Sequence, residues 1–426
     1  MLTREMKDSG VEWIGEVPRD WEISTISREY SSRVEKVSDF QYKPLSVTKN
    51  GIVPQLENAA KSANHNDRKL VLKNDFVINS RSDRKMSSGV SVEDGSVSLI
   101  NTVIYSDSIL PEYSNYLLKN YSFAEEFYRW GTGIVADLWS TNWEKMKKIA
   151  IPVPQIDNQK KIVDVLESKV KVIDTILLNT QQSITELKKY KQSLITEAVT
   201  KGIDKDAEMK DSGVEWIGEM PSERMIYRVK NLFFLKGRIG WQGLTSNEYK
   251  TEGPHLVTGT DFKEGRINWK STVRISEERF LEAPEIHIKN RDLLITKDGT
   301  IGKVAIVEDA PEKVSLNSGV LLIRCQKKQV IEIKYFYYIL LSDLFWKWYR
   351  LNDLGASTIK HLYQGQFNNF SFPLPCKKEQ QQIVDFLDEK TSRIDSLIKD
   401  KEEIFREYEE YKKSLIYEYV TGKKQV

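Results

Sequence analysis

A long segment that occurs twice constrains this chain more than any other feature. Residues 151–202 read IPVPQIDNQKKIVDVLESKVKVIDTILLNTQQSITELKKYKQSLITEAVTKG, and residues 372–423 repeat the plan as FPLPCKKEQQQIVDFLDEKTSRIDSLIKDKEEIFREYEEYKKSLIYEYVTGK. Each copy starts with Pro-x-Pro and ends in Tyr-Lys-x-Ser-Leu-Ile-x-Glu-x-Val-Thr. Apolar residues recur between these landmarks at steps of three and four, which predicts a helix of about 40 residues with one apolar stripe. Such a helix is about 60 Å long and needs a partner along its length.

A second repeat shows that the chain consists of two units in tandem. Residues 6–18 (MKDSGVEWIGEVP) return at 209–221 as MKDSGVEWIGEMP with a single difference, which chance cannot supply. Each unit has this signature, then a variable region, then the long helix. The predicted segments are the N-terminal signature (1–19), a first variable domain (20–150), the first helix (151–202), a linker with the second signature (203–221), a second variable domain (222–371), and the second helix with a tail (372–426).

Both variable domains are predicted to be α+β and to follow the same order of elements. In each domain two β-rich runs precede an aromatic helix. The runs are 75–80, 96–105 and 113–130 in the first domain, and 292–297, 315–325 and 335–350 in the second. Duplicated frames with divergent sequences suggest two similar tasks on two different targets.

The two long helices are each other's predicted partners. If a pseudo-two-fold axis relates the units, the helices pair antiparallel as a coiled coil. The alternative, in which each helix packs on its own domain, is disfavoured because the stripe is too long for one small domain to cover. The stripe positions expected at the helix pair are Ile162, Leu166, Ile173, Leu177, Leu187, Leu194, Ile383, Leu387, Ile394, Ile398, Phe405 and Leu415.

The composition and motifs argue against catalysis by this chain. The 426 residues include 30% charged residues at a net charge of +2, as in a globular protein, and no run of 18 apolar residues that would span a membrane. We therefore expect a cytoplasmic protein. Cys325 and Cys376 lack disulfide or zinc spacing, and the four histidines lack metal spacing. There is no phosphate loop, no dinucleotide fingerprint, and no Asn/Asp-Pro-Pro-aromatic run of adenine methyltransferases.

Nucleic-acid recognition has better support. Residues 224–243 hold five basic residues among aromatic ones and no acid, and the loops 81–89 and 297–303 follow corresponding strands. Basic groups neutralise phosphates, and loop polar groups read base edges, although a single basic loop is more often only solvated surface. The candidate DNA contacts are Arg81, Ser82, Arg84, Lys85, Ser87, Ser88, Arg228, Lys236, Arg238, Gln242, Lys297, Thr300 and Lys303.

With both repeats in hand, the chain resembles the specificity subunit of a type I restriction–modification enzyme over essentially its whole length. The resemblance rests on runs that occur in both units and on one strand–loop of the second domain. These are the signature 8–15 and its copy 211–218; Pro152-x-Pro154 with Gln159 and Pro373-x-Pro375 with Gln380; the helix ends 193–200 and 414–421; and the strand–loop 292–304.

The resemblance implies that each variable domain is a target recognition domain for one half of a bipartite asymmetric DNA site. It implies that the helices form an antiparallel coiled coil that sets the spacing between the halves. The helices and signatures would dock two modification subunits, which bind S-adenosylmethionine and methylate adenine N6. Two restriction subunits would join with ATP and magnesium. This chain would then be a non-enzymatic subunit that binds double-stranded DNA and holds no cofactor or metal.

Two other functions stay open at this stage. A structural adaptor would use the long helices for protein assembly without reading DNA. A stand-alone nuclease or methyltransferase is the third possibility, and the missing motifs disfavour it.

Overall fold

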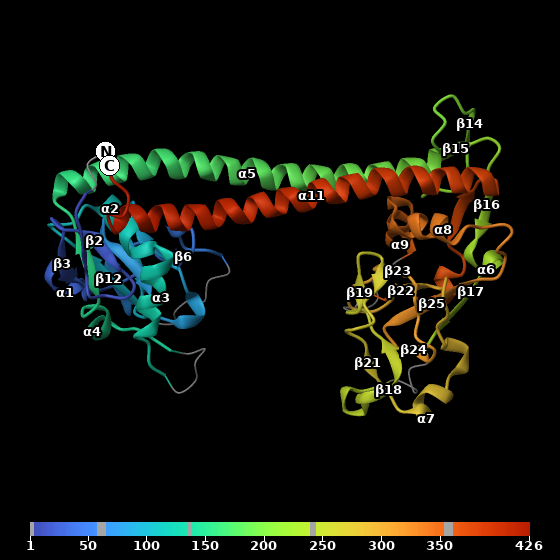
Figure 1. Cartoon of the computed structure of the whole chain (residues 1–426), viewed down its shortest axis with the longest axis horizontal. Helices are drawn as coiled ribbons and strands as arrows, with labels where there is room; N and C mark the ends of the chain where they lie inside the picture. Colours follow the sequence, from blue (N-terminus) through green and yellow to red (C-terminus); the bar gives the residue numbers. More distant parts are fainter. Residues whose placement is uncertain (1–3, 58–64, 134–138, 239–243, 353–360) are drawn as a thin grey trace. The chain divides into compact units, whose positions relative to one another are not determined.

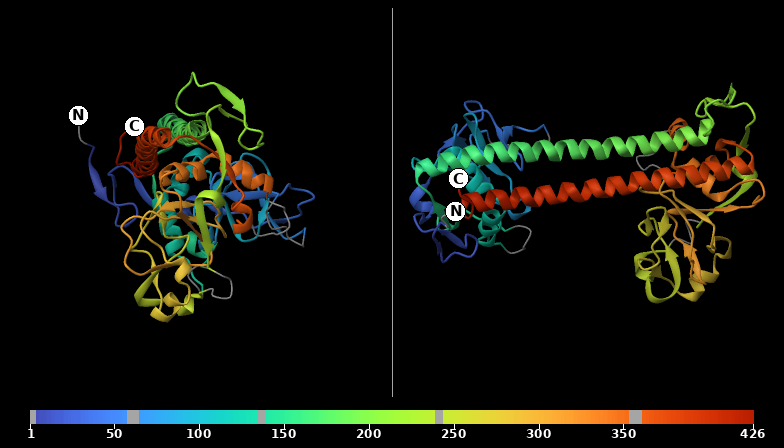
Figure 2. Two further views of the ribbon diagram at one scale, coloured as in Figure 1. Left: turned by 90° about the vertical axis from the view of Figure 1, so that its right-hand side faces the viewer. Right: turned by 45° about the horizontal axis from the view of Figure 1, so that its top comes forward.

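The computed structural model describes residues 4–57, 65–133, 139–238, 244–352 and 361–426. The chain divides into two compact units, unit 1 (1–181 and 402–426) and unit 2 (182–401). Helices α5 (Ile156–Lys201) and α11 (Lys377–Val420) are each shared between the two units (Figure 1). The first part of α5 and the last part of α11 belong to unit 1, and the remaining parts belong to unit 2. Within each unit the two helices lie side by side and run antiparallel (Figure 2). The predicted helix duplication is confirmed.

The described residues of unit 1 form two main sheets, three strand pairs and, besides the long helices, four short α-helices. The main sheets have the orders β10-β9-β12-β4 and β11-β8-β5. Their strands are β4 (Ser31–Ser32), β5 (Lys36–Val37), β8 (Arg68–Val71), β9 (Phe76–Asn79), β10 (Ser88–Val90), β11 (Gly95–Ser98) and β12 (Asn101–Tyr105). The pairs are β1 (Met6–Asp8) with β2 (Glu16–Pro18), β3 (Glu22–Thr25) with β13 (Ala150–Val153), and β6 (Leu45–Thr48) with β7 (Gly51–Pro54). The helices are α1 (Ile26–Glu29), α2 (Pro111–Lys119), α3 (Tyr121–Arg129) and α4 (Trp143–Met146).

Unit 2 has a similar set of sheets and strand pairs, but its three-stranded sheet includes a parallel pair, whereas that of unit 1 is antiparallel throughout. Its main sheets have the orders β17-β25-β22-β23 and β21-β18-β24. Their strands are β17 (Phe233–Gly237), β18 (Lys250–Val257), β21 (Val273–Arg274), β22 (Leu293–Thr296), β23 (Val304–Ile306), β24 (Val314–Leu316) and β25 (Val320–Cys325). The pairs are β14 (Met209–Asp211) with β15 (Glu219–Pro221), β16 (Met225–Arg228) with β26 (Ser371–Leu374), and β19 (Phe262–Lys263) with β20 (Arg266–Ile267). The helices are α6 (Val229–Leu232), α7 (Glu277–Leu281), α8 (Ile333–Leu341), α9 (Asp343–Asn352) and α10 (Gln364–Phe367).

The structure divides two predicted elements in each unit, and it does so at matching places. The aromatic helix breaks at Asn120 in unit 1 and at Ser342 in unit 2, where ψ is 157° and 162°. The Asn120 side chain accepts a hydrogen bond from Phe123 N at 2.9 Å and so begins α3. A short polar side chain of this kind forms hydrogen bonds with backbone groups that would otherwise bond within a helix. The spacing of apolar residues does not reveal such a break. The second β-rich run likewise becomes two strands, β11 and β12 in unit 1 and β24 and β25 in unit 2.

The predicted stripes are buried or half-buried, but their packing changes along each helix. Ile184 packs with Ile394 and Ile398 of the other helix, and Leu187 joins this cluster. Ile162 and Leu166 lie in the large apolar cluster of unit 1, whose members include domain residues, and Ile383 and Leu387 lie in that of unit 2. Ile173 and Leu415 also belong to the unit 1 cluster, with Leu177 packed against it; Leu194 is packed against the unit 2 cluster, and Phe405 is half-buried. The alternative in which each helix packs on its own domain, which the sequence disfavoured, is therefore correct for the first turns of each helix.

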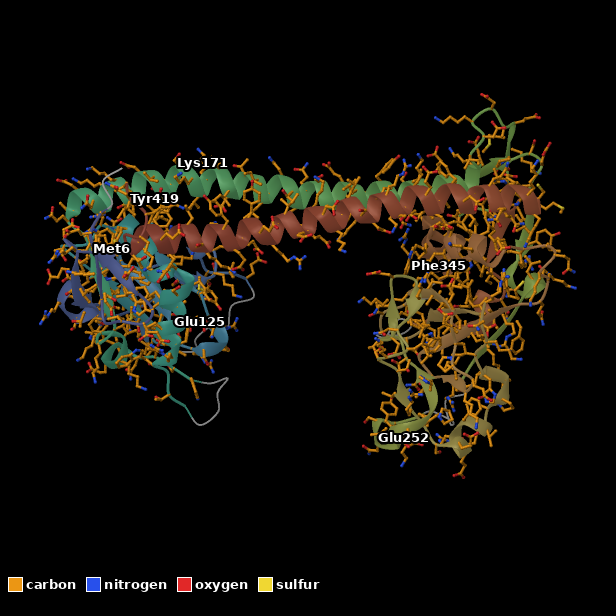
Figure 3. The ribbon with its side chains drawn as sticks, viewed as in Figure 1. Met6, Glu125, Lys171, Glu252, Phe345 and Tyr419 are labelled. Carbon is orange, nitrogen blue, oxygen red and sulfur yellow. The ribbon has the colours of Figure 1, made fainter. Side chains whose placement is uncertain are left out.

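Equivalent ion pairs join the helices in both units. Lys191 pairs with Asp395 in unit 2, and Asp174 pairs with Lys412 in unit 1. The two lysines occupy the same place in the two helix copies, and so do the two aspartates. In unit 2 the lysine comes from α5 and the aspartate from α11, and in unit 1 the two helices exchange these roles. Such an exchange is expected for two antiparallel helices related by a pseudo-two-fold axis. Figure 3 shows the side chains along both helices.

Candidate nucleic-acid interface and helix-end junctions

The two predicted basic loops occupy equivalent places. The first joins β9 to β10 and the second joins β22 to β23, and both strand pairs are antiparallel. In each unit the loop therefore leaves the strand next to the sheet's edge and returns along the edge strand. The prediction that these loops correspond is confirmed.

The unit 2 loop is held in place by its own backbone and by α9. Thr296 Oγ1 donates to Thr300 O and accepts from Lys303 N at 3.0 Å. Gly302 has a φ of +83°, and a Cβ there would lie 2.5 Å from the Trp346 ring, so the turn requires glycine. Thr300 and Lys303 are exposed, whereas the Lys297 side chain is only 16% exposed and lies 3.8 Å from Asp298. This loop presents a hydroxyl and an ammonium group to solvent from a fixed backbone.

The unit 1 loop is more exposed, and its three basic side chains all have acidic neighbours. It contains a short 3-10 turn, Ser82–Arg84. Arg81 and Arg84 lie on either side of Asp83, at 3.7 and 3.6 Å from its carboxylate. Lys85 pairs with Glu125 of α3 at 3.1 Å. Both arginines stay 44% or more exposed, so their guanidinium groups are available to a ligand.

Other predicted contacts are placed differently. Arg228 is exposed, and Lys236 is half-buried at 3.6 Å from Glu285. Gln242 lies outside the described residues. Ser87 and Ser88 are buried because β10 begins there, a strand boundary that the polar sequence did not indicate.

Arg238 has a structural role. It is 3% exposed, and its guanidinium donates to Leu316 O at 2.9 Å and to Ser315 Oγ at 3.0 Å. Burial lowers the pKa of this side chain. Arg68 uses Ser96 in the same manner in unit 1. Since Arg238, Ser87 and Ser88 do not face solvent, we do not carry them into the proposed interface.

The acidic residues before β9 and β22 have structural roles. Asp75 is buried and accepts two hydrogen bonds from Arg33, at 2.6 and 3.1 Å. Asp292 is buried and accepts two from Arg324, at 2.8 and 2.6 Å. The described residues contain no group of three or more His, Cys, Asp or Glu that could hold a metal ion.

A repeated glutamine fixes the start of each long helix. Gln159 Oε1 accepts from Leu110 N at 2.9 Å, and its Nε2 donates to Pro154 O at 3.0 Å. Gln380 accepts from Glu332 N at 2.7 Å and donates to Pro375 O at 2.9 Å. The sequence showed both glutamines as parts of the repeated runs but did not indicate their structural role. They join the Pro-x-Pro stop to the turn before the aromatic helix.

A buried tyrosine from each domain holds the end of the other helix copy. Tyr113 Oη donates to Val420 O at 3.1 Å in unit 1, and Tyr335 Oη donates to Val199 O at 3.1 Å in unit 2. Burial raises the pKa of both phenols. The sequence placed both tyrosines at the start of the predicted aromatic helices and gave them no role at the helix ends.

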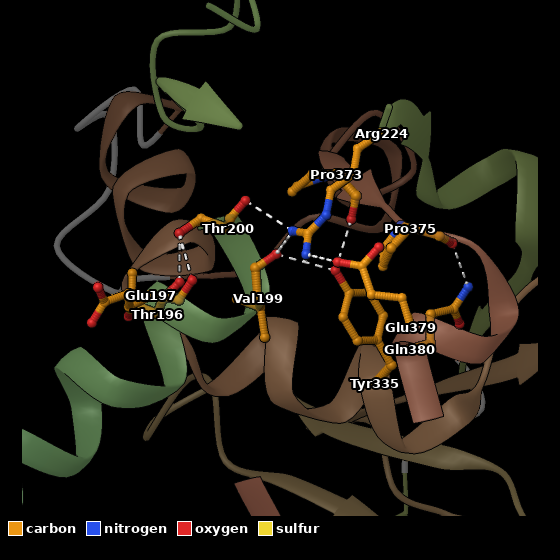
Figure 4. Close-up of polar contacts among 10 residues, drawn as sticks. All are labelled: Thr196, Glu197, Val199, Thr200, Arg224, Tyr335, Pro373, Pro375, Glu379 and Gln380. Carbon is orange, nitrogen blue, oxygen red and sulfur yellow. Dashed lines mark hydrogen bonds and ion pairs between the residues drawn. The ribbon is translucent and has the colours of Figure 1, made fainter. Parts of the chain in front are cut away.

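In unit 2 the same helix end is also held by Arg224, which Figure 4 shows beside Tyr335. Arg224 is 1% exposed and donates to Val199 O at 3.0 Å and to Thr200 O at 2.9 Å. It also pairs with Glu379 of α11. Carbonyls at a helix C-terminus lack intrahelical partners, and a cation there is stabilising. The sequence placed Arg224 in a basic segment and did not reveal this role.

The signature forms the same turn in both units. Asp8 Oδ1 accepts from Gly10 N and Ser9 Oγ from Val11 N, and the second copy repeats both bonds. Trp13 Nε1 donates to Ala150 O at 3.0 Å, and Trp216 Nε1 donates to Ser371 O at 2.9 Å. The signature is therefore a hairpin whose tryptophan is hydrogen-bonded to the strand leading to the long helix.

A hollow lies beside each signature. The first has about 910 Å³ and includes Trp13, Tyr121, Glu125 and Tyr417, together with Ser82, Asp83 and Lys85 of the basic loop. The second has about 460 Å³ and includes Trp216, Asp343, Lys347 and Thr196. Both are bounded by the signature tryptophan, the first turn of α3 or α9, and the last turns of a long helix.

Comparisons with known proteins agree with this architecture. Residues 244–406 match the family model described as the type I restriction modification DNA specificity domain. The chain is 24% identical to a putative type I restriction enzyme MjaX specificity subunit of Methanocaldococcus jannaschii, over 97% of this chain and 96% of that protein. It is also 24% identical to the EcoBI specificity subunit of Escherichia coli, over 58% and 53%.

Solved structures show the same fold. A chain from work on complex assembly and conformational transition of the type I R-M system has a TM-score of 0.73 at 15% identity, covering 95% of this chain and 98% of that one. The HsdS subunit of Thermoanaerobacter tengcongensis has a TM-score of 0.51 at 14% identity, covering 97% and 99%. No helix among the described residues is long and apolar enough to cross a membrane. Residues 244–406 thus match the type I restriction modification DNA specificity domain, and the chain is similar over nearly its whole length to a type I restriction enzyme specificity subunit.

Proposed function

We propose that this chain is the DNA-reading subunit of a type I restriction–modification complex and that each unit reads one half of a bipartite, asymmetric site. One observation carries the proposal. A basic hairpin loop occupies the same place in both units, while its residues differ completely. Equal placement with unequal chemistry is what two half-sites of different sequence require.

The proposed DNA contacts are the exposed or partly exposed polar groups of these loops and of the basic segment after the second signature. Guanidinium groups bind guanine edges or phosphates, and ammonium groups mainly neutralise phosphates. The residues are Arg81, Ser82, Arg84, Lys85, Arg228, Lys236, Lys297, Thr300 and Lys303.

The long helices would set the distance between the two half-sites. Their antiparallel pairing within each unit, with equivalent ion pairs, supports a rigid spacer. The signatures and helix ends would dock two modification subunits and, with them, two restriction subunits. We assign no cofactor to this chain. S-adenosylmethionine, ATP and Mg²⁺ would belong to the partner subunits.

Methylome mapping of cells that express this chain with its modification partner tests the proposal. We expect a split motif with one methylated adenine in each half, on opposite strands. A contiguous motif would contradict the two-reader arrangement. Binding of the modification subunit without any sequence-dependent footprint would instead identify a structural adaptor. The purified chain should be inert with DNA and Mg²⁺ or S-adenosylmethionine, and turnover would overturn the non-catalytic assignment.

A further inference from the structure

The C-terminal lysines fill a place in unit 1 that stays open in unit 2. Lys423 Nζ donates to the signature carbonyls of Ile14 and Glu16, the latter at 3.0 Å, and lies 4.6 Å from the Tyr417 ring centre. Lys424 pairs with Glu418 at 2.8 Å. Burial lowers the pKa of Lys423, while the nearby Glu16 and Glu418 act in the opposite direction.

Unit 2 has the acceptors but not the lysines. Glu219 and Glu197 occupy the places of Glu16 and Glu418, whereas Gly202 and Ile203 occupy those of Lys423 and Lys424. The Cβ position of Gly15 lies 3.5 Å from Lys423 Nζ. At the matching Gly218, no heavy atom of the described residues lies within 4 Å of that position.

The open place is part of the second hollow. The charged groups that line this hollow are Glu197, Glu219, Asp343, Lys201 and Lys347. None of them takes part in an ion pair within the described ranges, and the acids outnumber the bases. A net negative hollow beside the signature carbonyls disfavours DNA, whose phosphates are anionic, and favours a cationic side chain from a protein.

We propose that the second hollow receives a lysine of the modification subunit, in the position that Lys423 occupies in unit 1. The inference rests on the proposed function, because it takes the modification subunit as the occupant. The internal contacts of unit 1 supply the binding geometry: one ammonium group bridges two signature carbonyls, and the next lysine pairs with the carboxylate of Glu418. Unit 1 satisfies this site itself, so the two signatures would engage the partner differently.

Zero-length carbodiimide cross-linking of the purified complex tests the assignment directly, because it joins carboxylates only to amines in contact with them. We expect Glu219 or Glu197 to link to a lysine of the modification subunit, with the internal Glu418–Lys424 link as positive control. Links from Glu219 or Glu197 to Lys423 or Lys424 of another copy of this chain would overturn the proposal, as would the absence of any intermolecular link at both glutamates.

Binding measurements provide the second arm. The E197Q/E219Q chain should bind the modification subunit about tenfold more weakly and with less salt dependence. E223Q removes an exposed acid outside the hollow and should bind as the original chain does. S193W fills the hollow without removing a charge and should also weaken binding. Unchanged binding of both hollow variants would sink this inference alone, whereas an original chain that does not bind the modification subunit would overturn the proposed function with it.

Discussion

The two helix-end junctions use one signature but different chemistry around it. In unit 1 the end of α11 is held by Tyr113, and Lys423 binds the signature carbonyls. In unit 2 the end of α5 is held by Tyr335 and by the buried Arg224, which pairs with Glu379. Arg224 stands where unit 1 has Trp21, a buried indole whose Nε1 has no partner among the described atoms.

Some features of the junction are shared by both units, and others occur in one unit only. The signature turn, the glutamine and the tyrosine recur with nearly equal distances, so they form the shared frame. The lysines at these two places occur only after α11. After α5 the chain must continue into the second signature, and an arginine from that segment stabilises the helix end instead.

The largest loss of stability should come from substitution of Arg224, which has no counterpart in unit 1. Substitution R224M leaves Glu379 and two helix-end carbonyls without their buried cation, which should lower the free energy of unfolding of unit 2 by about 3–5 kcal/mol. Chemical denaturation with a probe in each unit measures it. R228M, an exposed arginine of the same unit, should change stability by less than about 0.5 kcal/mol. Equal effects of the two substitutions would contradict the structural role of Arg224.

Substitution of the equivalent glutamines should lower the stability of the two units by equal amounts. Q159A and Q380A each leave a backbone N–H and a proline carbonyl without their side-chain partner, so each should destabilise its unit by about 2–3 kcal/mol. Q381A, an exposed neighbour, serves as control. A large loss in one unit and none in the other would break the proposed equivalence of the helix starts.

The shared tyrosines should give a smaller matched pair. Y113F and Y335F each remove one hydrogen bond to a helix-end carbonyl and keep the ring, so each should cost about 1–2 kcal/mol. Thermal unfolding of the two variants and of Y363F, an exposed tyrosine, is the measurement. If neither variant differed from Y363F, the hydroxyls would not be holding the helix ends.

The smallest effect should come from the helix ion pairs. The side chains of Asp174, Lys412, Lys191 and Asp395 are 28–55% exposed, so solvent screens both pairs. D174N and K191M should each cost about 0.2–1 kcal/mol, and less at high salt. The charge exchange D174K/K412D should recover most of the loss. Failure of the exchange with losses above this range would indicate that these residues act through other contacts.

Sequence alone predicted the frame of the molecule because the frame is repeated. Two copies of the helix and of the signature predicted the tandem plan, and the matching runs of the variable domains predicted the order of elements along each unit and the place of the basic loops. Periodicity could not show the breaks at Asn120 and Ser342, since a polar residue bonds to the backbone there in an otherwise helical run. It also could not show that the first turns of each helix pack on a domain.

The candidate site was less predictable from sequence. Arg238 and Arg81 are both arginines in basic segments, yet one is 3% exposed and the other faces solvent. The difference depends on whether neighbouring strands bring a carbonyl and a serine to the guanidinium, which is a tertiary property. Lys423 shows the same limit, because its partners lie at the opposite end of the chain.

Exchange of one recognition domain tests the central claim that each unit is an independent reader. Residues 222–371 are replaced by the corresponding domain of another family member, and the methylome is mapped with the modification partner. The account predicts that one half of the split motif changes while the other half and the spacer length are retained. A change in both halves, or a change in the spacer with both halves retained, would contradict it.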